Sequence, residues 1–206
     1  MTRVRRRRGR EKSVNDTDRF FVITGGPGSG KSSLLDALQS HGYQRSVEAG
    51  RAIIQQQLAI GGRALPWDDR LLFAELMLSW EIRSYEMARQ SSGIVFFDRG
   101  VPDIAGYLRL IHQPVPAQVQ KAIEAFRYHP QVFIAPPWRD IFTQDAERKQ
   151  DFDEAVRTYD ALAATYNEHG YELLELPRAS VAERVNFVLG KIGAVEPNPS
   201  KAGSVL

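Results

Sequence analysis

Apolar residues along the chain form two kinds of pattern, short continuous runs and longer stripes with helical spacing. Five short runs rich in β-branched and aromatic residues predict buried strands. These predicted strands cover residues 19–24, 43–47, 94–98, 131–135 and 171–176. Between them, apolar residues recur every three or four positions, which predicts amphipathic helices. These predicted helices cover residues 31–41, 51–60, 66–90, 103–111, 116–128, 152–169 and 181–188.

The order of these elements predicts an α/β fold. Strands that alternate with helices form a parallel sheet, because each helix carries the chain back to the edge where the previous strand began. We therefore expect one domain over residues 19–190, with a five-stranded parallel sheet and helices on both faces. An apolar stripe in the predicted helix 66–90 is expected to be core, although periodicity leaves open whether it covers the sheet or a second subunit. The stripe consists of Phe73, Leu76, Met77, Trp80 and Met87.

The charge distribution separates the N-terminus from the rest of the chain. Residues 1–12 hold seven basic side chains and one acidic one, whereas the whole chain has a net charge of +2, so the remainder is net acidic. We interpret residues 1–18 as a basic disordered leader and residues 191–206 as a loose C-terminal tail. The leader is able to bind nucleic acid or an anionic membrane by charge. Because no other segment repeats its pattern, we do not favour either partner.

Composition narrows the class of protein further. The chain has 206 residues, of which 43% are hydrophobic and 25% charged, as is typical of a globular protein. It contains no cysteine, which excludes disulfides, thiol nucleophiles and thiolate metal sites. No apolar run approaches the roughly 20 residues of a membrane span, and the first residues lack the apolar stretch of a secretory signal. We therefore expect a cytoplasmic protein.

A glycine-rich segment joins the first predicted strand to the first predicted helix. It reads Gly25-Gly26-Pro27-Gly28-Ser29-Gly30-Lys31-Ser32-Ser33, and its first eight residues match the P-loop (Walker A) pattern. Backbone N–H groups of such a loop turn inward and hold phosphate oxygens at the helix N-terminus. In that arrangement Lys31 reaches the β- and γ-phosphates, Ser32 contributes a hydroxyl to Mg²⁺, and Ser33 lies near the α-phosphate. The sequence therefore predicts ATP and Mg²⁺ as cofactors.

Two pairs of charged residues follow the second and third predicted strands. Asp98 ends an apolar strand, where a carboxylate can lie beside the metal, and Arg99 adds a cation to the same cleft. Asp98 is also a candidate helix cap before Gly100. Glu48 and Arg51 follow the second strand and could bind and deprotonate an acceptor hydroxyl. An ordinary surface ion pair is the alternative interpretation of these two residues.

A charged segment separates the fourth predicted strand from a long helix. Residues 138–151 have few large apolar side chains and contain Arg139, Arg148 and Lys149. Basic residues in a lid can close over a triphosphate and neutralise charge during phosphoryl transfer. A solvated start of the next helix is the alternative, and Arg157 is a weaker candidate for the same role.

In chain order, these segments resemble one group of P-loop proteins, the small AAA-like ATPase and kinase domains. This group includes the ribosylnicotinamide kinase module of the bacterial NAD regulators, and the chain is similar more broadly to nucleoside and nucleotide kinases. The resemblance spans about residues 19–190. The segments that carry it are residues 25–33, Glu48 with Arg51, Phe97-Asp98-Arg99-Gly100 with Pro102-Asp103, and Pro136-Pro137-Trp138-Arg139-Asp140 with Arg148.

The resemblance implies a P-loop NTPase fold with five parallel strands, an ATP-Mg²⁺ site, an acceptor cleft and a helical lid. It implies that Asp98 is the strand-end acid and metal ligand, Arg99 a ligand of phosphate or acceptor, and Arg148 the lid arginine. Asp103 has a matching place and is expected at the acceptor site. The Asn-Lys-x-Asp motif that reads guanine is absent, which disfavours a GTPase. Arg99 stands where hydrolytic AAA ATPases carry a water-activating glutamate, which favours transfer over hydrolysis.

Three functions are compatible with these features. The leading hypothesis is a kinase that moves the γ-phosphoryl group of ATP to a small hydroxyl-bearing metabolite such as a nucleoside. A nucleotide-dependent regulatory switch with slow hydrolysis is the second. The third is a nucleic-acid-associated ATPase that uses the arginine-rich leader. The sequence identifies neither the acceptor nor the oligomeric state.

Overall fold

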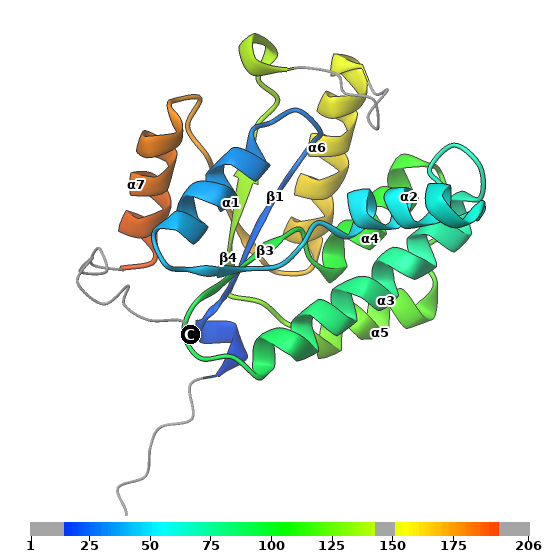
Figure 1. Ribbon diagram of the computed structural model, residues 1–206, viewed down its shortest axis with the longest axis horizontal. Coiled ribbons are helices and arrows are strands. Elements are labelled where there is room, and N and C mark those ends of the chain that lie inside the picture. Colours follow the sequence, from blue (N-terminus) through cyan, green and yellow to red (C-terminus); the bar gives the residue numbers. More distant parts are fainter. Residues whose placement is uncertain (1–14, 143–150, 194–206) are drawn as a thin grey trace, which may run out of the picture.

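A computed structural model describes residues 15–142 and 151–193 of the chain (Figure 1). The central part of the predicted lid, with Arg148 and Lys149, lies outside the described residues, as do most of the leader and of the C-terminal tail. The helices are α1 (Lys31–Ser40), α2 (Ala49–Ile60), α3 (Arg70–Arg89), α4 (Val101–Leu110), α5 (Ala117–Ala125), α6 (Phe152–Glu168) and α7 (Val181–Lys191). The strands are β1 (Phe20–Gly25), β2 (Gln44–Arg45), β3 (Val95–Asp98), β4 (Gln131–Ala135) and β5 (Glu172–Glu175). Short 3-10 helices cover Asp16–Asp18 and Arg139–Ile141.

The five strands form one parallel sheet in the order β2-β3-β1-β4-β5. The predicted α/β class and the five-stranded parallel sheet are therefore confirmed. Strand β1 lies at the centre, where its residues Ile23 and Gly25 stand opposite Asp98 of β3 and Ala135 of β4. The carboxyl ends of β1 and β3 consequently lie side by side, which brings the loops that follow them to the same edge of the sheet.

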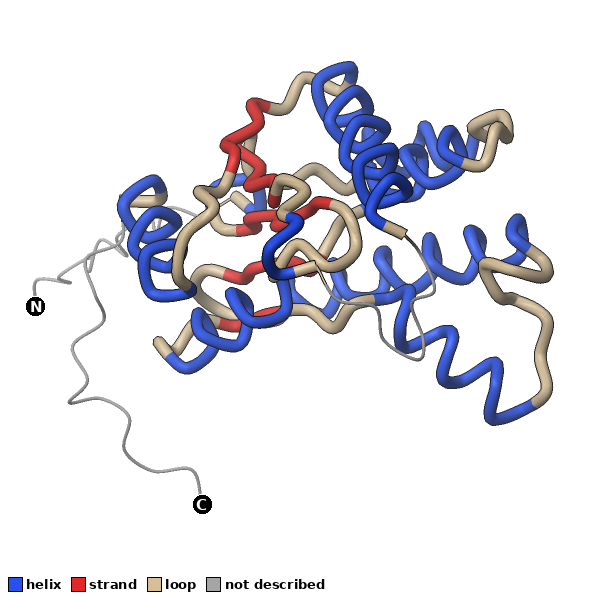
Figure 2. Tube along the Cα trace, turned by 90° about the horizontal axis from the view of Figure 1, so that it is seen from above, coloured by secondary structure: helices blue, strands red, loops and turns tan. Residues whose placement is uncertain are grey.

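Helices cover both faces of the sheet and enclose two separate hydrophobic cores (Figure 2). On one face, α1 and α7 pack on alternate strand residues such as Phe21, Ile23 and Phe133. On the other face, α2 to α6 pack on the intervening residues, including Phe20 and Phe97. This alternation follows from the two-residue period of a strand, whose successive side chains point to opposite faces. The second face is the thicker one because five helices gather there (Figure 1).

Two helices begin earlier than the sequence pattern predicted. Helix α2 begins at Ala49, so Glu48 is its N-cap residue, and α4 begins at Val101. The Asp103 carboxylate accepts the backbone N–H of Gly100 at 2.9 Å, which caps the start of α4. The small residues Ala49 and Gly50 in α2 and Pro102 in α4 gave no clear helical spacing of large apolar side chains in these first turns. Both helix N-termini therefore lie next to the predicted charged residues.

The apolar stripe of α3 is core in its first part but not throughout. Phe73 and Met77 are buried, whereas Met87 is 59% exposed, so its assignment to the core was wrong. In the second half of the helix the buried face is occupied instead by Glu81, Tyr85 and Ala88. The buried face continues from Met77 at four-residue steps through Glu81 and Tyr85, and the polar Glu81 hid this continuation from a pattern of apolar residues. No helix in the described ranges combines the length and apolarity needed to cross a membrane.

Candidate active site

The glycine-rich loop runs from β1 directly into α1 and is shaped by glycines at left-handed backbone positions. Gly28 and Gly30 have φ angles of +68° and +78°, which residues with a Cβ adopt only with strain. Gly30 is the N-cap residue of α1, so the first N–H groups of the helix open onto the loop. The arrangement places backbone donors and the positive end of a helix dipole at one point, as an anion site requires.

Lys31 is folded into this loop and is only 4% exposed. Its Nζ donates hydrogen bonds to the carbonyl oxygens of Gly25 at 3.2 Å and Gly26 at 3.1 Å. Ser29 Oγ also donates to the Gly26 carbonyl, at 2.8 Å. The ammonium group is thus held beside the loop, and carbonyl contacts of this kind are exchangeable for phosphate oxygens.

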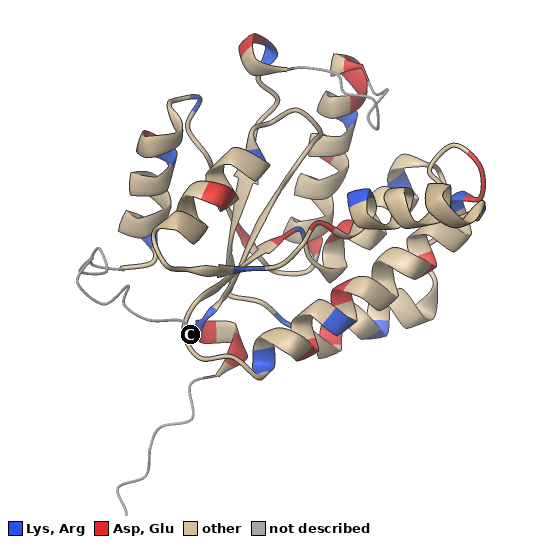
Figure 3. Ribbon diagram, in the orientation of Figure 1, with Lys and Arg blue, Asp and Glu red and all other residues tan. Residues whose placement is uncertain are grey.

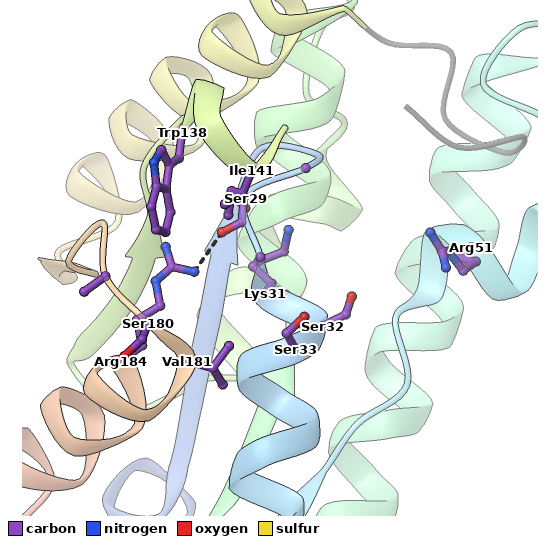
Figure 4. Close-up of a pocket in the computed structure, with 13 residues that line it drawn as sticks. Ser29, Lys31, Ser32, Ser33, Arg51, Trp138, Ile141, Ser180, Val181 and Arg184 are labelled. Atoms are coloured by element: carbon purple, nitrogen blue, oxygen red, sulfur yellow. Dashed lines mark hydrogen bonds between the residues drawn. The ribbon is translucent and has the colours of Figure 1, made fainter. Parts of the chain in front are cut away.

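A first cavity of about 490 Å³ opens at the loop (Figure 4). The predicted residues Ser32 and Ser33 line it together with Lys31. On its other side lie Trp138 and Arg184, with the guanidinium carbon 5.4 Å from the centroid of the indole ring. This volume lies within the range of pockets for nucleotide-sized ligands. Figure 4 shows Arg184 and Trp138 on one side of Lys31 and Arg51 on the opposite side.

Arg184 is a residue of this cavity that the sequence analysis missed. It lies in α7, it is 2% exposed, and burial lowers the pKa of its guanidinium. Its Nη1 donates to the Ser29 carbonyl at 2.9 Å, and its Nε donates to the Pro177 carbonyl at the same distance. Arg184 therefore ties the P-loop to the connection between β5 and α7. The sequence held one clue to this role: Arg184 directly precedes Val185 on the apolar side of an amphipathic helix, where a charged residue is unusual.

The predicted charged residues at the ends of β2 and β3 come together in space. Arg99 Nε lies 3.7 Å from Glu48 Oε1, and Arg99 Nη1 lies 3.0 Å from Asp103 Oδ1. Figure 3 shows acidic and basic positions gathered where the chain leaves β3 and enters α2. Burial alone lowers the pKa of Arg99, but the carboxylates of Asp103, Glu48 and Asp98 outweigh it and raise that pKa above its ordinary value. Arg99 is therefore a permanent cation in a mostly acidic cluster.

Asp103 holds this cluster in place. Its carboxylate accepts hydrogen bonds from Thr24 Oγ1 and Tyr166 Oη at 2.6 Å each, in addition to those from Arg99 and the Gly100 N–H. With four donors around it, Asp103 is saturated, so we assign it to positioning Arg99. Arg99 itself has a φ of +73°, a strained backbone position that these contacts fix.

A second cavity of about 590 Å³ lies on the other side of the P-loop. All four residues predicted to bind the acceptor line it, namely Glu48, Arg51, Arg99 and Asp103. Arg51 lines the first cavity as well, so the two cavities meet at this residue. Most of the remaining lining residues come from α2, α3, α4 and α6, and four more of them are ionisable, namely Arg70, Glu81, Glu154 and Arg157.

Glu81 and Tyr107 also line the second cavity and were not predicted. Glu81 is 2% exposed and follows Phe73 and Met77 at four-residue intervals on α3. Tyr107 lies one helical turn after Asp103 on α4, and its ring meets that of Phe73 edge to face, with centroids 5.7 Å apart. Glu81 could have been found in the sequence, because it is a carboxylate at a position that continues an apolar row of the helix. Nothing in the spacing of apolar residues distinguished Tyr107 from a tyrosine of the core.

Asp98 lies at the carboxyl end of β3 and is 3% exposed. Its backbone N–H donates to Ser46 Oγ at 3.0 Å, and it lines neither of the two cavities. Within residues 15–142 and 151–193, no group of three or more histidine or carboxylate side chains is placed to hold a metal. Mg²⁺ at nucleotide sites uses few protein ligands besides phosphate and water, so Ser32 with Asp98 remains the predicted pair.

The residues on either side of the predicted lid contact each other. The rings of Phe142 and Phe152 meet edge to face with centroids 5.5 Å apart, and the Arg139 guanidinium lies 4.1 Å above the Phe152 ring. Phe142 also lies against Gly28 of the P-loop, where a Cβ atom would approach its ring to 2.5 Å. The start of the segment is thus anchored at the P-loop, while the predicted role of Arg148 stays a prediction.

A glycine-rich loop at the end of the central strand, flanked by two cavities, defines the domain as a P-loop kinase-like domain. The sequence profile of the AAA domain family matches residues 20–184. The chain therefore belongs to the AAA domain family, as the resemblance in its motifs predicted. None of the curated proteins matches the chain in sequence.

Several solved structures share the fold. A NadR protein in complex with NR superimposes with a TM-score of 0.66 at 16% identity, over 88% of this chain and 54% of that one. The chain thus spans about half the length of the NadR protein. Deoxyadenosine kinase from M. mycoides with bound dATP gives a TM-score of 0.56 at 13% identity, over 85% and 100% of the two chains. Thymidylate kinase from Ehrlichia chaffeensis gives 0.56 at 14% identity, over 85% and 98%.

Proposed function

We propose that this protein is a small-molecule kinase that transfers the γ-phosphoryl group of ATP-Mg²⁺ to a hydroxyl of a nucleoside-like metabolite. The observation that carries the proposal is the pair of cavities that flank the P-loop and meet at Arg51. Phosphoryl transfer requires a donor and an acceptor that face each other across one reacting phosphorus. A protein that only hydrolyses nucleotide needs room for water on the acceptor side, whereas this chamber holds about 590 Å³.

The first cavity has the groups that a triphosphate requires. The N–H groups at the start of α1 and the ammonium of Lys31 supply positive charge to the phosphates, and the cavity leads from them toward Trp138 and Arg184. Ser32 and Asp98 are the residues that would hold Mg²⁺. The ion would neutralise negative charge on the transferring phosphoryl group. The donor side therefore fits ATP-Mg²⁺ in both shape and charge.

The second cavity has groups suited to an acceptor hydroxyl. Glu48 lies at the N-terminus of α2, beside Arg99, with its carboxylate lining the chamber. We assign it to orienting the hydroxyl and accepting its proton as the oxygen attacks phosphorus. Arg99 and Arg51 then stabilise the charge on the phosphoryl oxygens during transfer. Because Asp103 holds Arg99, the cation does not have to move into place during the reaction.

The test is ATP consumption with Mg²⁺, measured alone and with a panel of nucleosides, nucleotides and other small hydroxyl compounds. We expect at least one compound to raise the rate about tenfold or more and to appear as its phosphate ester in mass spectra. Lys31→Ala should lose about a hundredfold or more of this activity without unfolding, because Lys31 serves the phosphates rather than the core. Lys121→Ala, at an exposed position of α5, is the matched control.

Two results would contradict the kinase assignment. Unchanged turnover in Lys31→Ala would mean that the P-loop is not the catalytic site. A rate that no acceptor raises, together with tight nucleotide binding, would instead identify a nucleotide-dependent regulatory switch. Glu48→Gln provides a further check, because removal of the proton acceptor should lower kcat about a hundredfold or more and leave ATP binding intact.

A further inference from the structure

Glu81 is a buried acid with an unpaired side-chain oxygen among the residues that the structure describes. Its Oε2 atom is inaccessible to solvent and has no hydrogen-bond partner among the described residues, although the residue lines the acceptor cavity. Such a group lowers stability, so its presence in a folded protein calls for an explanation. A cavity-lining position suggests that the missing partner is a ligand.

The surroundings of Glu81 favour the neutral form of its carboxyl group. Burial raises the pKa of Glu81 well above its ordinary value, and the nearby carboxylates of Asp103, Asp98 and Glu48 raise it further, against the opposing effect of Arg99. A neutral carboxylic acid has an O–H that donates one hydrogen bond and a carbonyl that accepts one. The donor and the acceptor lie side by side on one carboxyl group, so the group can pair with a ligand edge that has an acceptor beside a donor. A charged carboxylate has no donor and cannot pair in this way.

The rest of this part of the cavity is apolar and aromatic. Phe73, Met77 and Glu81 form one row along α3, and at 1.5 Å per residue this row is about 12 Å long. Tyr107 packs on Phe73 at the far end of the row from Glu81. The hydroxyl of Tyr107 is a second buried polar atom without a hydrogen-bond partner in the described part of the chain. Aromatic walls with a polar group at each end suit a flat heterocycle.

We propose that Glu81 is the specificity-determining residue of the acceptor chamber, where it reads a heterocycle that carries a hydrogen-bond donor beside an acceptor. Amide, carboxamide and amino-azine edges have this arrangement, so the acceptor class is a nucleoside whose base presents such an edge. The inference rests on the proposed function, because it names the acceptor of the same reaction. Recognition of this kind is strong, since an analogue that lacks the donor leaves the buried acid unpaired.

Calorimetric binding to the full chain tests the inference without requiring turnover. Two ligand pairs differ at this edge: adenosine against purine riboside, and nicotinamide riboside against nicotinate riboside, which also differ by one negative charge. The wild type should bind the first member of at least one pair about tenfold or more tighter than its counterpart. Glu81→Gln should keep this preference within about threefold, because a carboxamide also has one donor beside one acceptor. Glu81→Leu should reduce the preference to less than about threefold.

Glu75→Leu is the matched control, because Glu75 is an exposed acid on the same helix and does not line the cavity. It should keep the preference of the wild type. Circular dichroism and thermal melting establish that each variant is folded. Glu81→Leu should melt at a higher temperature than the wild type, because it removes an unpaired buried acid.

Three results would overturn the inference. One is a preference that survives in Glu81→Leu, and another is the absence of binding by all four compounds. The third is equal loss of binding in Glu81→Gln and Glu81→Leu, which would mean that a charged carboxylate binds a cation. Discrimination within a ligand pair without phosphoryl transfer would support the role of Glu81 and contradict the kinase assignment. Phosphoryl transfer without discrimination would support the kinase assignment and contradict the role of Glu81.

Discussion

At the scale of single residues, the carboxylate of Asp103 organises the charged cluster of the site, because all of its hydrogen-bond acceptor positions are filled. Its two oxygen atoms accept four hydrogen bonds, and the donors come from β1, α6 and the start of α4. A buried anion is tolerated only when donors replace the water that it has lost. The same bonds hold Arg99 at its left-handed backbone position. The orientation of the Arg99 guanidinium is therefore determined by the partners of Asp103 as well as by Asp103 itself.

We predict that Tyr166→Phe destabilises the protein by about 1.5–3 kcal/mol, because it removes a hydrogen bond to a buried charged group. The Tyr166 hydroxyl donates to Asp103 at 2.6 Å inside the core. Urea denaturation followed by circular dichroism measures the change. Tyr159→Phe is the control, since the Tyr159 hydroxyl donates to Glu175 over the same distance at an exposed position. We expect this variant to lose less than about 0.5 kcal/mol. Equal losses would refute the special role of the Asp103 network.

The buried acid Glu81 predicts a pH dependence of stability. Burial raises the pKa of Glu81 in the folded state, so the folded protein binds more protons than the unfolded chain above the ordinary pKa of 4.5. The free energy of unfolding must then fall as pH rises through that window. We expect wild type to lose stability relative to Glu81→Gln as pH rises above about 5, by up to about 1.4 kcal/mol per pH unit. Urea midpoints at several pH values measure it, and a constant difference would show that Glu81 is charged in the folded state.

At the scale of an element, the start of α1 is the predicted phosphate site. Gly30 combines a left-handed conformation with crowded surroundings, since a Cβ added there would lie 2.8 Å from Arg184 Nη1 and 3.1 Å from Ile141 Cδ1. The helix N-terminus, the anchoring arginine of α7 and the segment before the lid thus meet at one residue. The conformation of the P-loop at Gly30 therefore depends on the absence of a side chain.

We predict that Gly30→Ala destabilises the protein by at least about 1 kcal/mol more than Gly170→Ala. Gly170 has nearly the same φ, +77° against +78°, but a Cβ there meets nothing within 4 Å. The pair therefore separates backbone strain from crowding. Thermal or urea unfolding of both variants gives the comparison. The same loss in both would mean that Arg184 moves away at no cost, and the proposed anchoring of the P-loop would be wrong.

At the scale of the whole molecule, one sheet edge brings two cavities into contact. The donor cavity lies between the P-loop and the β5–α7 connection, and the acceptor cavity lies among α2, α3, α4 and α6. The loops that end β1, β2 and β3 meet between them because parallel strands present their carboxyl ends together. The two cavities therefore share Arg51 and the loops at this edge of the sheet.

We predict that the non-hydrolysable analogue AMP-PNP with Mg²⁺ stabilises the wild type by about 2.7 kcal/mol at a hundredfold excess over its Kd. The reason is mass action, because the site exists only in the folded chain. Differential scanning calorimetry across analogue concentrations measures the effect. Lys31→Ala should lose most of the stabilisation at the same concentration, whereas Lys121→Ala should retain it. Full stabilisation of Lys31→Ala would place the nucleotide elsewhere.

The sequence by itself determined the order of elements, the parallel sheet and the P-loop. Each of these depends on local information, either the spacing of apolar residues or a run of nine consecutive positions. Glu48, Arg51, Arg99 and Asp103 were also predictable as one group, because they follow strands that end at the same edge. Their individual roles were not, and the saturation of Asp103 emerged only from its partners.

Only the tertiary structure placed Arg184, Glu81 and Tyr107 in the site. These residues lie on helices far from the P-loop in sequence, in positions where a core side chain is the usual occupant. Whether a buried polar atom has a partner depends on side chains that arrive from other elements, and no local pattern encodes that. The predicted phosphate site is therefore built by consecutive residues, whereas the cavity proposed for the acceptor is built by how the helices pack.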